Sequence, residues 1–328
     1  MSSLKLYKVL ITGGAGFIGS NLADRLLNMQ CKVIVYDNLD EYYSGKEENM
    51  QHNLNRKNFC FIKGDLLDYE RLFKYTKKVD IVFHLAAQPG VRFSMINPDK
   101  TLKVNVLGML NVLRASKEAG VKRLIFASSS SVYGQINYRS VDEQHPTKPI
   151  SIYGISKLAA ENLCKIFGDQ LGLRVVILRY HTVYGPRQRP DMAIYRWVNE
   201  IFKGEPLTIY GDGNQTRDFT YIDDVIDATI KAAEVDGING EIFNIGGGTS
   251  VSVNQVTALI AKLTGVNVEV IYEPPKAGDV SHTCADISKA KRMLGYEPKT
   301  KFEEGLKRFI DWYKAYKIGS GKNHSLFM

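Results

Sequence analysis

The sequence contains few cysteines, and none of them stands close to another. Only four occur in 328 residues, namely Cys31, Cys60, Cys164 and Cys284. They are too sparse for a disulfide-rich module and too far apart for the paired ligands of a structural metal site. We therefore expect a reducing compartment, the cytoplasm, and no metal.

Long apolar runs and blocks of one charge are also missing. No stretch approaches the roughly 18 apolar residues that a membrane span needs, so we expect no membrane partner. The formal net charge is +8, but acidic residues are interleaved with the basic ones, which argues against a nucleic-acid partner. This positive surplus suits a small polyanion such as a nucleotide diphosphate.

What is present is an alternation of short apolar strands and helical stretches. It predicts an α/β fold with a Rossmann-type doubly wound parallel sheet. After Tyr180, glycine and proline divide the chain into short elements, which predicts a smaller, interleaved C-terminal substrate lobe. The predicted strands are 8–12, 32–36, 59–63, 81–85, 123–128, 175–179 and 242–245, and the predicted helices begin near 17 and cover 99–119 and 153–171.

The predicted domain boundaries follow from these elements. Residues 1–180 together with about 219–248 form the sheet domain, because 242–245 is expected to return to the main sheet as a strand. Residues 181–218 and 249–318 form the substrate lobe. The last segment, 319–328, is expected to be a frayed tail.

Three glycines follow the first predicted strand at three-residue intervals. Gly13, Gly16 and Gly19 leave out Cβ atoms that would obstruct a tight turn, the approach of backbone N–H groups to a pyrophosphate, or close helix packing. Asp37 ends the next strand, where a carboxylate accepts both hydroxyls of an adenosine ribose and repels a 2′-phosphate. Together they predict a dinucleotide site that takes NAD rather than NADP.

Two residues near this site have more than one interpretation. Asp65 ends the third predicted strand and either binds the adenine amine or forms the N-cap of the next helix. His84 ends the fourth predicted strand, and we expect it to be a packed core histidine rather than a catalyst. The further expected NAD contacts are Phe17, Ile18, Asn38, Leu66, Leu85, Ala86, Ala87, Asn105, Ser128 and Tyr180.

A tyrosine and a lysine share one face of a predicted helix. Tyr153 and Lys157 are spaced i and i+4. An ammonium near the phenol favours the phenolate and lowers the pKa of the tyrosine from about 10, which makes it a base near neutral pH. Upstream, the hydroxyls of 128–131 lie at the carboxyl end of a predicted strand, the edge at which doubly wound sheets bind ligands.

These motifs, in this order, resemble the extended short-chain dehydrogenase/reductase family over nearly the whole chain, and within it the NAD-dependent nucleotide-sugar epimerases and dehydratases. The glycine run, Ser128–Gly134 and Tyr153 with Lys157 carry the resemblance. It implies that Ser129, Tyr153 and Lys157 are catalytic, that Ser129 shares the hydrogen bond to the substrate O4, and that Tyr153 and Lys157 also contact NAD. Tyr153 then takes the 4-OH proton, NAD takes the C4 hydride, and the hydride returns to the other face once the 4-keto sugar has rotated.

The residues before Val132-Tyr133-Gly134 distinguish the branches of that family. Members that dehydrate or decarboxylate usually have an acid there, and dehydratases have an Asp-Glu pair for proton chemistry at C5 and C6. This chain has Ser130 and Ser131 instead. The resemblance therefore implies a 4-epimerase, with a nucleotide-sugar dehydratase or decarboxylase as the alternative.

The second half of the chain resembles the UDP-binding segments of the family. Arg217 matches the arginine that grips the diphosphate, since a guanidinium fits phosphate geometry; the alternative is a salt bridge with a neighbouring acid. Lys276 and Asp279 match the diphosphate and ribose contacts, although many relatives have arginine or glutamine in place of the lysine. Thr208 and Tyr210 match the uridine-binding strand.

Two segments bear on the identity of the sugar. Residues 90–94 and 182–192 resemble UDP-glucuronate 4-epimerases, in which a basic site can hold the C6 carboxylate. Arg92 and Arg189 are the candidates for that contact. The leading hypothesis for the substrate is therefore the UDP-glucuronate/UDP-galacturonate pair.

Four further positions concern the fit of the sugar. Ser130 and Thr182 are expected substrate contacts. Thr283 matches the position that gates bulk at the sugar, and a small residue there also admits an N-acetyl group. UDP-GlcNAc/UDP-GalNAc 4-epimerase is therefore the nearest alternative, and UDP-glucose fits either. His181 departs from the usual aromatic residue, which leaves its role open.

The resemblance also bears on partners. Relatives commonly dimerise by pairing two helices into a four-helix bundle, which implies a homodimer through 99–119 and 153–171. A non-catalytic NAD-binding regulator is a different class of hypothesis, suggested by the positive charge alone; the intact set of Ser129, Tyr153 and Lys157 argues against it. A reductase of a free keto sugar is a third, which sustained consumption of NADH would favour.

Overall fold

The computed structural model describes residues 4–136, 140–276 and 278–318. At its centre is a parallel sheet whose seven described strands follow the order β11-β6-β5-β4-β1-β2-β3. These strands are β1 (Lys8–Thr12), β2 (Lys32–Asp37), β3 (Phe59–Lys63), β4 (Ile81–His84), β5 (Arg123–Ser129), β6 (Val175–Tyr180) and β11 (Ile242–Ile245). The order reverses between β1 and β4, as in a doubly wound sheet. The predicted fold class is confirmed.

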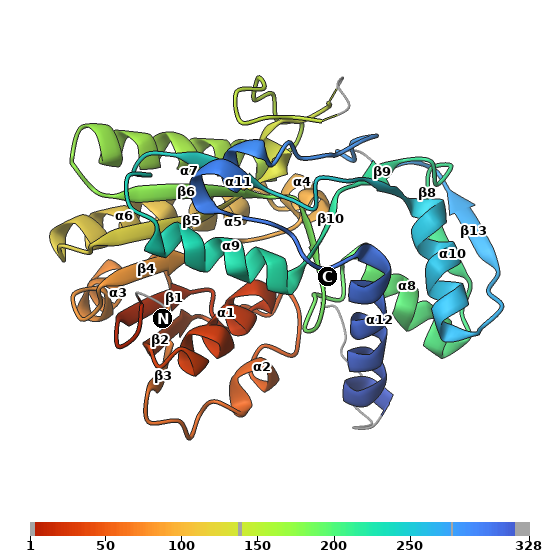
Figure 1. The fold of residues 1–328 in the computed structure, drawn as a ribbon, viewed down its shortest axis with the longest axis horizontal. Coiled ribbons are helices and arrows are strands. Elements are labelled where there is room, and N and C mark those ends of the chain that lie inside the picture. The colour runs from red at the N-terminus through yellow and green to blue at the C-terminus, as the bar shows by residue number, and fades with distance from the viewer. Residues whose placement is uncertain (1–3, 137–139, 277, 319–328) are drawn as a thin grey trace.

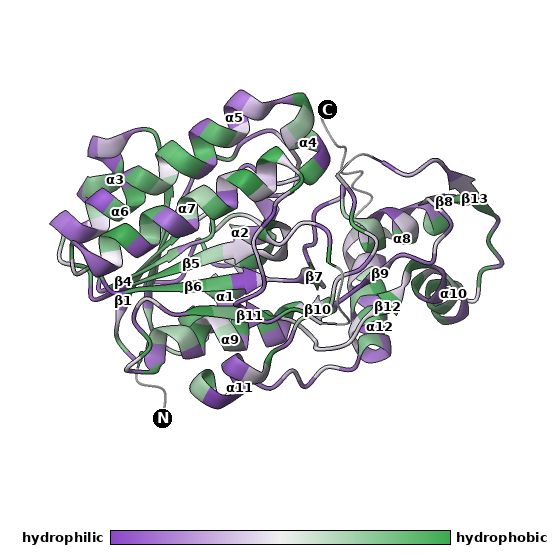
Figure 2. Cartoon of the chain, turned by 90° about the horizontal axis from the view of Figure 1, so that it is seen from above, coloured by the Kyte–Doolittle hydropathy of each residue, from purple (hydrophilic) through white to green (hydrophobic). Residues whose placement is uncertain are grey.

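Helices cover both faces of this sheet (Figure 2). On one face lie α1 (Phe17–Asn28), α9 (Ile222–Glu234) and α11 (Ser288–Leu294), and on the other lie α3 (Tyr69–Thr76), α6 (Gly108–Glu118) and α7 (Ile152–Asp169). Because both faces are covered, β6 is buried along its whole length and β5 along all but its last residue. The near-continuous apolar runs of these strands in the sequence have the same cause.

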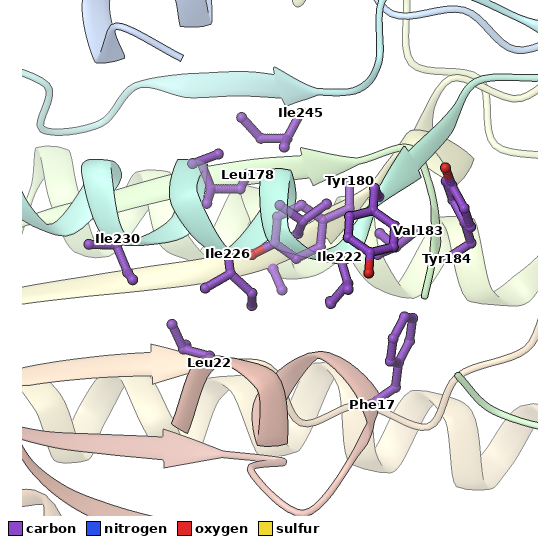
Figure 3. Packing of buried hydrophobic residues seen from close by; sticks show 14 of the residues in the cluster. Phe17, Leu22, Leu178, Tyr180, Val183, Tyr184, Ile222, Ile226, Ile230 and Ile245 are labelled. Atoms are coloured by element: carbon purple, nitrogen blue, oxygen red, sulfur yellow. The ribbon is translucent and has the colours of Figure 1, made fainter. Parts of the chain in front are cut away.

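The core between α1 and α9 supports one side of the sheet. Figure 3 shows Phe17 and Leu22 of α1 opposite Ile222, Ile226 and Ile230 of α9. All five side chains are 7% exposed or less. This packing holds α1 firmly against the sheet, and with it the turn that precedes the helix.

After β6 the chain builds a second group of elements at one end of the sheet (Figure 1). Parallel pairs join β7 (Thr182–Tyr184) to β10 (Phe219–Tyr221) and β8 (Leu207–Tyr210) to β13 (Val270–Glu273), and an antiparallel pair joins β9 (Thr216–Arg217) to β12 (Val251–Ser252). The helices of this group are α8 (Ala193–Lys203), α10 (Val253–Thr264) and α12 (Phe302–Tyr313). Between its two halves the chain returns to the sheet through α9 and β11, so the two groups are interleaved.

The predicted helix over 99–119 is interrupted. It consists of α5 (Pro98–Leu102), a π-helical turn η1 (Lys103–Leu107) and then α6, because the buried Asn105 in the π turn is bonded to groups outside the helix. Elsewhere the predicted element ends differ by one or two residues. The remaining short helices are α2 (Glu48–Gln51), α4 (Val91–Ile96), η2 (Ser130–Val132) and η3 (Lys314–Ile318).

Two expectations about the whole chain can be placed against this structure. Over the described residues, no helix has both the length and the apolar character that a bilayer crossing needs. The tail expected at 319–328 lies outside the described residues.

Candidate active site

The carboxyl ends of β1, β2, β4, β5 and β6 border a cavity of about 410 Å³. It lies at the point where the strand order reverses, which is the binding position in a doubly wound sheet. The structure brings into its wall most of the residues predicted for the cofactor and the reacting sugar: Gly13, Gly16, Phe17, Ile18, Asp37, Asn38, Asp65, Leu66, Leu85, Ala86, Ala87, Ser128, Ser129, Ser130, Tyr153, Lys157, Tyr180, Thr182 and Arg189.

The glycine turn leaves space for a ligand to approach the backbone. Gly13 has a φ of 71°, and a Cβ on it would lie 2.6 Å from the backbone of Ala86. Gly16 is the N-cap of α1 and offers no side chain to the free N–H groups of the first helical turn, so these groups remain available to an anion. The turn therefore fits the pyrophosphate of a dinucleotide.

Asp37 is fixed at the end of β2, in the wall of this cavity. Its Oδ2 accepts a hydrogen bond from the Ala15 N–H at 3.1 Å, and its Oδ1 accepts one from the Leu39 N–H at 2.9 Å. Burial raises the pKa of Asp37, and the two backbone bonds and the nearby Lys46 oppose that rise. Each oxygen keeps a further lone pair for a ribose hydroxyl, so the position fits NAD.

Asp65 is not the N-cap of the following helix. That position belongs to Asp68, whose side chain accepts a hydrogen bond from the Arg71 N–H. Asp65 instead lies in the cavity wall, where its Oδ1 accepts from the Leu67 N–H at 2.8 Å and its Oδ2 from Asn38 Nδ2 at 3.0 Å. The N-cap interpretation of Asp65 is therefore wrong, and its contact with the adenine amine stays a prediction.

Asn105 lies behind the cavity rather than in its wall. Its Oδ1 accepts from the Gln88 N–H at 2.7 Å, and its Nδ2 donates to Gln88 O at 3.1 Å and to Ser156 Oγ at 2.9 Å. The Ser156 hydroxyl in turn donates to Tyr153 O at 2.7 Å. Asn105 thus braces the loop after β4 against α7, whereas we predicted a direct contact with the cofactor.

Tyr153 and Lys157 lie on the first turns of α7. Ser151 is the N-cap of this helix, and its Oγ accepts a hydrogen bond from the Gly154 N–H at 3.1 Å. Lys157 Nζ donates to Ala127 O, at the end of β5, at 2.8 Å. It lies 5.9 Å from the centre of the Tyr153 ring. The i, i+4 pair predicted from the sequence therefore meets the strand end that carries the serines.

The electrostatics of this pair differ from the simple expectation. Burial raises the pKa of Tyr153, and the groups that oppose this rise are the Arg189 guanidinium and a hydrogen bond with Ser129. Burial lowers the pKa of Lys157 to about 8, with Glu161 opposing. We predicted that Lys157 lowers the pKa of Tyr153; in this structure burial raises that pKa, and the cation that opposes the rise is Arg189.

The two arginines that we predicted for a sugar carboxylate lie in different places. Arg189 lines the same cavity as Tyr153; its Nε and Nη2 donate to the two carboxylate oxygens of Asp191 at 2.9 and 3.0 Å. Arg92 instead lies over the ring of Tyr210 at 4.5 Å and forms an ion pair with Asp279 at 2.9 Å. Arg92 therefore belongs with the residues predicted for the nucleotide.

A second, more open cavity of about 910 Å³ is bordered by most of the residues that we predicted for the nucleotide. Tyr210, Arg217, Lys276 and Asp279 are in its wall, and Lys276 Nζ lies 4.6 Å from the centre of the Tyr210 ring. Arg217 forms no ion pair within the described residues, so the salt-bridge alternative is not what the structure has. Thr208 is outside the wall; its carbonyl accepts from Arg196 and Trp197.

Two histidines and a threonine near the cavities are buried polar side chains. His84 is 1% exposed, lies 2.7 Å from Thr12 Oγ1 and has a pKa lowered by burial to about 3, so it is the core histidine that we expected. Burial also lowers the pKa of His181, which lines the first cavity. Thr283 lies outside the walls of both cavities and accepts a hydrogen bond from the Asp218 N–H at 3.0 Å.

Several residues of the site were missed from the sequence. Tyr42, Tyr43 and Lys46, on the loop after β2, line the first cavity, and the Tyr42 hydroxyl donates to Asp191 Oδ2 at 3.1 Å. Nothing in their local spacing indicates a site, because the loop reaches the cavity only through tertiary packing. Glu161 was also missed, although its position four residues after Lys157 is visible in the sequence.

Residues 9–246 match the model of the NAD dependent epimerase/dehydratase family. The protein belongs to this family. NAD is accordingly its cofactor, and Gly13, Gly16 and Asp37 are the described residues whose geometry fits it. The described residues contain no group of three His, Cys, Asp or Glu side chains that could hold a metal ion.

Several members of the family are similar to this chain over nearly its whole length. A UDP-glucuronate 4-epimerase of Thermodesulfobacterium geofontis is 39% identical over 310 residues, which cover 93% of this chain and 95% of the relative. The crystal structure of the UDP-glucuronic acid 4-epimerase from Bacillus cereus in complex with UDP-glucuronic acid and NAD has a TM-score of 0.90 at 39% identity, covering 94% of this chain and 99% of that one. The UDP-N-acetylglucosamine 4-epimerase from Methanobrevibacter ruminantium, in complex with UDP-N-acetylmuramic acid, has a TM-score of 0.89 at 37% identity, covering 95% and 99%.

Proposed function

We propose that this protein is an NAD-dependent UDP-sugar 4-epimerase and that its substrate pair is UDP-glucuronate and UDP-galacturonate. The observation that carries the choice of sugar is the Arg189 guanidinium, which lies in the same cavity wall as Ser129 and Tyr153. A cation at the reacting end of the sugar suits a C6 carboxylate. Family membership and the likeness to UDP-glucuronate 4-epimerases support the reaction.

Each residue around the sugar has a separate role in the reaction. NAD supplies the acceptor for the C4 hydride and returns it. Tyr153 receives the proton of the 4-hydroxyl and gives it back, while Ser129 holds O4 by a hydrogen bond. The ammonium of Lys157 stabilises the phenolate form of Tyr153, which accepts this proton. Burial keeps this site out of bulk water, which strengthens each of these contacts.

Arg189 is held in the position that this role requires. Its Nε and Nη2 are bonded to Asp191, and the Tyr42 hydroxyl fixes Asp191 in turn. The planar guanidinium has five N–H donors, so donors remain for a carboxylate after the pair with Asp191 has formed. The side chain is 20% exposed, which leaves it accessible from the cavity.

The acids in the cavity favour epimerisation over elimination. Among the described residues of its wall, the carboxylates are Asp37, Asp40 and Asp65. They lie at or just after the ends of β2 and β3, where we expect the adenosine half of NAD. Beside Tyr153 the wall has Ser129, Ser130 and Ser131, which cannot supply a general acid near neutral pH. Proton chemistry at C5 therefore has no carboxylate close to it.

Turnover of three UDP-sugars tests this proposal. The protein would be incubated separately with UDP-glucuronate, UDP-GlcNAc and UDP-glucose plus NAD, and the C4 epimers resolved by NMR. We expect conversion of UDP-glucuronate, and a loss of about a hundredfold or more in the Tyr153→Phe variant, because the phenol is the proton acceptor.

Arg189→Met separates the choice of sugar from the reaction. Because Arg189 also opposes the rise of the Tyr153 pKa, conversion of both sugars should fall, but kcat/KM for UDP-glucuronate should fall by roughly 10- to 100-fold more than that for UDP-glucose, the loss expected for a charge-assisted contact. Preferential conversion of UDP-GlcNAc by the unaltered protein would contradict the proposed sugar while leaving the 4-epimerase reaction intact. No conversion of any UDP-sugar would contradict both.

We also infer a cytoplasmic homodimer that acts without nucleic acid. The cysteines that the structure describes are all free, as in proteins of a reducing compartment. Exposed Leu107 and Ile166, on η1 and α7, support a helix-paired dimer. The cationic groups Arg189, Arg217 and Lys276 lie in cavities, which suits a small anion better than a polynucleotide.

A further inference from the structure

A buried carboxylate lies one helical turn beyond the catalytic lysine. Glu161 is four residues after Lys157 on α7, so the two side chains are neighbours on one face of the helix. Glu161 is 1% exposed and Lys157 is 3% exposed. A carboxylate so deeply buried needs charged and hydrogen-bonding partners.

Glu161 has those partners, and they come from two strands of the sheet. Arg179 of β6 donates from Nε to Oε1 at 2.9 Å and from Nη2 to Oε2 at 2.7 Å. Ser128 of β5 donates from Oγ to Oε1 at 2.5 Å. The remaining nitrogen of Arg179, Nη1, donates to Tyr133 Oη at 2.9 Å and to Glu143 O at 3.1 Å. The carboxylate is thus held in one place by Ser128, which lines the first cavity, and by Arg179, which does not.

Lys157 does not join this network directly. Its ammonium donates to Ala127 O at 2.8 Å and lies 5.0 Å from the centre of the Phe126 ring. Within the part of the chain that the structure describes, it forms no ion pair with Glu161, whose salt bridge is with Arg179. The ammonium therefore remains in the wall of the first cavity with a counter-charge close by.

The other groups facing Lys157 leave Glu161 as its anion. On α7 these are Cys164, whose thiol burial keeps neutral near pH 7, and Tyr153, which is an anion only as the phenolate of the reaction. On β4 the neighbour is His84, which burial also keeps neutral. Burial lowers the pKa of Lys157, and Glu161 opposes this lowering more strongly than Cys164 does.

We propose that Glu161 is a positioning residue: clamped by Arg179 and Ser128, it supplies the fixed negative charge that keeps Lys157 protonated and in the cavity. Because its oxygens are held by Arg179 and Ser128, Glu161 cannot draw the ammonium away from the cofactor side. The same clamp ties Ser128, next to the substrate serine Ser129, to α7. This inference rests on the catalytic role of Lys157 in the proposed function.

The test compares three variants with the unaltered protein. Glu161→Gln removes the charge and keeps the shape, and Glu161→Gln/Arg179→Gln removes both charges so that no guanidinium is left buried without its partner. Cys164→Ala is the matched control, because Cys164 is equally buried on the same helix and raises the pKa of Lys157 less than Glu161 does. Melting temperatures report whether each variant folds.

The first readout needs no turnover. Competitive labelling with a trace of acetic anhydride over a range of pH, read by peptide mass spectrometry, gives the apparent pKa of Lys157. Both variants that lack Glu161 should show it lower by on the order of one unit, and Cys164→Ala should lower it much less. The single variant should melt lower than the double variant, because only the single variant leaves Arg179 unpaired.

The second readout is the pH profile of epimerisation. Loss of the Lys157 proton ends activity at high pH, so a lower lysine pKa moves the alkaline limb to lower pH. In Glu161→Gln, kcat should be roughly fivefold lower at pH 8 but less than twofold lower at pH 6.5, for a shift of about one unit, with KM unchanged. A purely structural brace would lower kcat equally at both pH values.

Each outcome has a separate meaning. An unchanged lysine pKa in both Glu161 variants overturns the inference, whatever the activity. Shifted pKa values in a protein that converts no UDP-sugar uphold the charge assignment and contradict the proposed function instead. A pKa that returns to normal in the double variant would assign the effect to Arg179 and overturn the role of Glu161.

Discussion

Single residues set what the cofactor cavity accepts, and Gly13 offers a controlled test of this. Gly13→Ala should abolish NAD binding, because the new Cβ would lie 2.6 Å from the backbone of Ala86 and would displace the turn or the loop after β4 that line the cavity. Gly120 is the matched control, since its φ of 67° is similar and nothing lies within 4 Å of a Cβ built there. Gly120→Ala should cost about 1 kcal/mol of stability and bind NAD normally. Calorimetric titration with NAD decides between these results, and equal affinity in both variants would contradict the assigned turn.

The preference for NAD over NADP depends on a second residue. Asp37→Ser removes the carboxylate that we predict to face the 2′-position of the ribose, and it keeps a hydroxyl there. The variant should lose most of its discrimination, with the ratio of NADP to NAD affinity rising by roughly tenfold or more. Titration of each nucleotide measures this ratio. A ratio unchanged from the unaltered protein would show that Asp37 does not select the cofactor.

The residues that could be predicted from the sequence are those whose role follows from local spacing. Gly13 and Gly16 need only a strand and a helix on either side, and Tyr153 and Lys157 need only one helical turn. The partner of Arg189 could not be found in the same way, because its role depends on where Tyr42 and Asp191 lie after folding. Glu161 illustrates the same limit, since its clamp on β6 is not local.

At the scale of elements, the sheet followed directly from the sequence and the helix over 99–119 did not. Strands buried on both faces are apolar throughout, which makes them easy to recognise. The π turn of η1 depends on hydrogen bonds that Asn105 accepts from the Gln88 N–H and donates to Ser156 Oγ, and such contacts leave no periodic signal. The division of the chain at 1–180 with 219–248 remains a prediction.

We predict that the dimer forms through η1 and α7. Leu107 of η1 is 52% exposed and Ile166 of α7 is 56% exposed, which is a high exposure for large apolar side chains unless a partner covers them. Leu107→Glu and Ile166→Glu should each convert a dimer into a monomer in sedimentation velocity at micromolar concentration. Ile271→Glu is the control, because Ile271 is 44% exposed on β13, at the far end of the molecule from α7 (Figure 1). A monomeric unaltered protein would refute the dimer.

At the scale of the whole molecule, the site depends on two groups of elements that the chain interleaves. The sheet contributes the cavity with Tyr153 and Lys157, and the second group contributes the cavity with Tyr210 and Arg217. The ion pair of Arg92 on α4 with Asp279 links the two groups at 2.9 Å. A UDP-sugar that filled both cavities would place its nucleotide by one group and its reacting carbon by the other.

The fate of the C4 hydrogen tests this account most directly. UDP-glucuronate deuterated at C4 would be incubated with the protein and NAD in ordinary water, and the product examined by NMR and mass spectrometry. We predict UDP-galacturonate that keeps its deuterium at C4, with no net formation of NADH, because the same hydride leaves and returns within one closed site. Loss of deuterium to the solvent, or a product that has lost its carboxyl group, would contradict transient oxidation at C4 followed by return of the hydride.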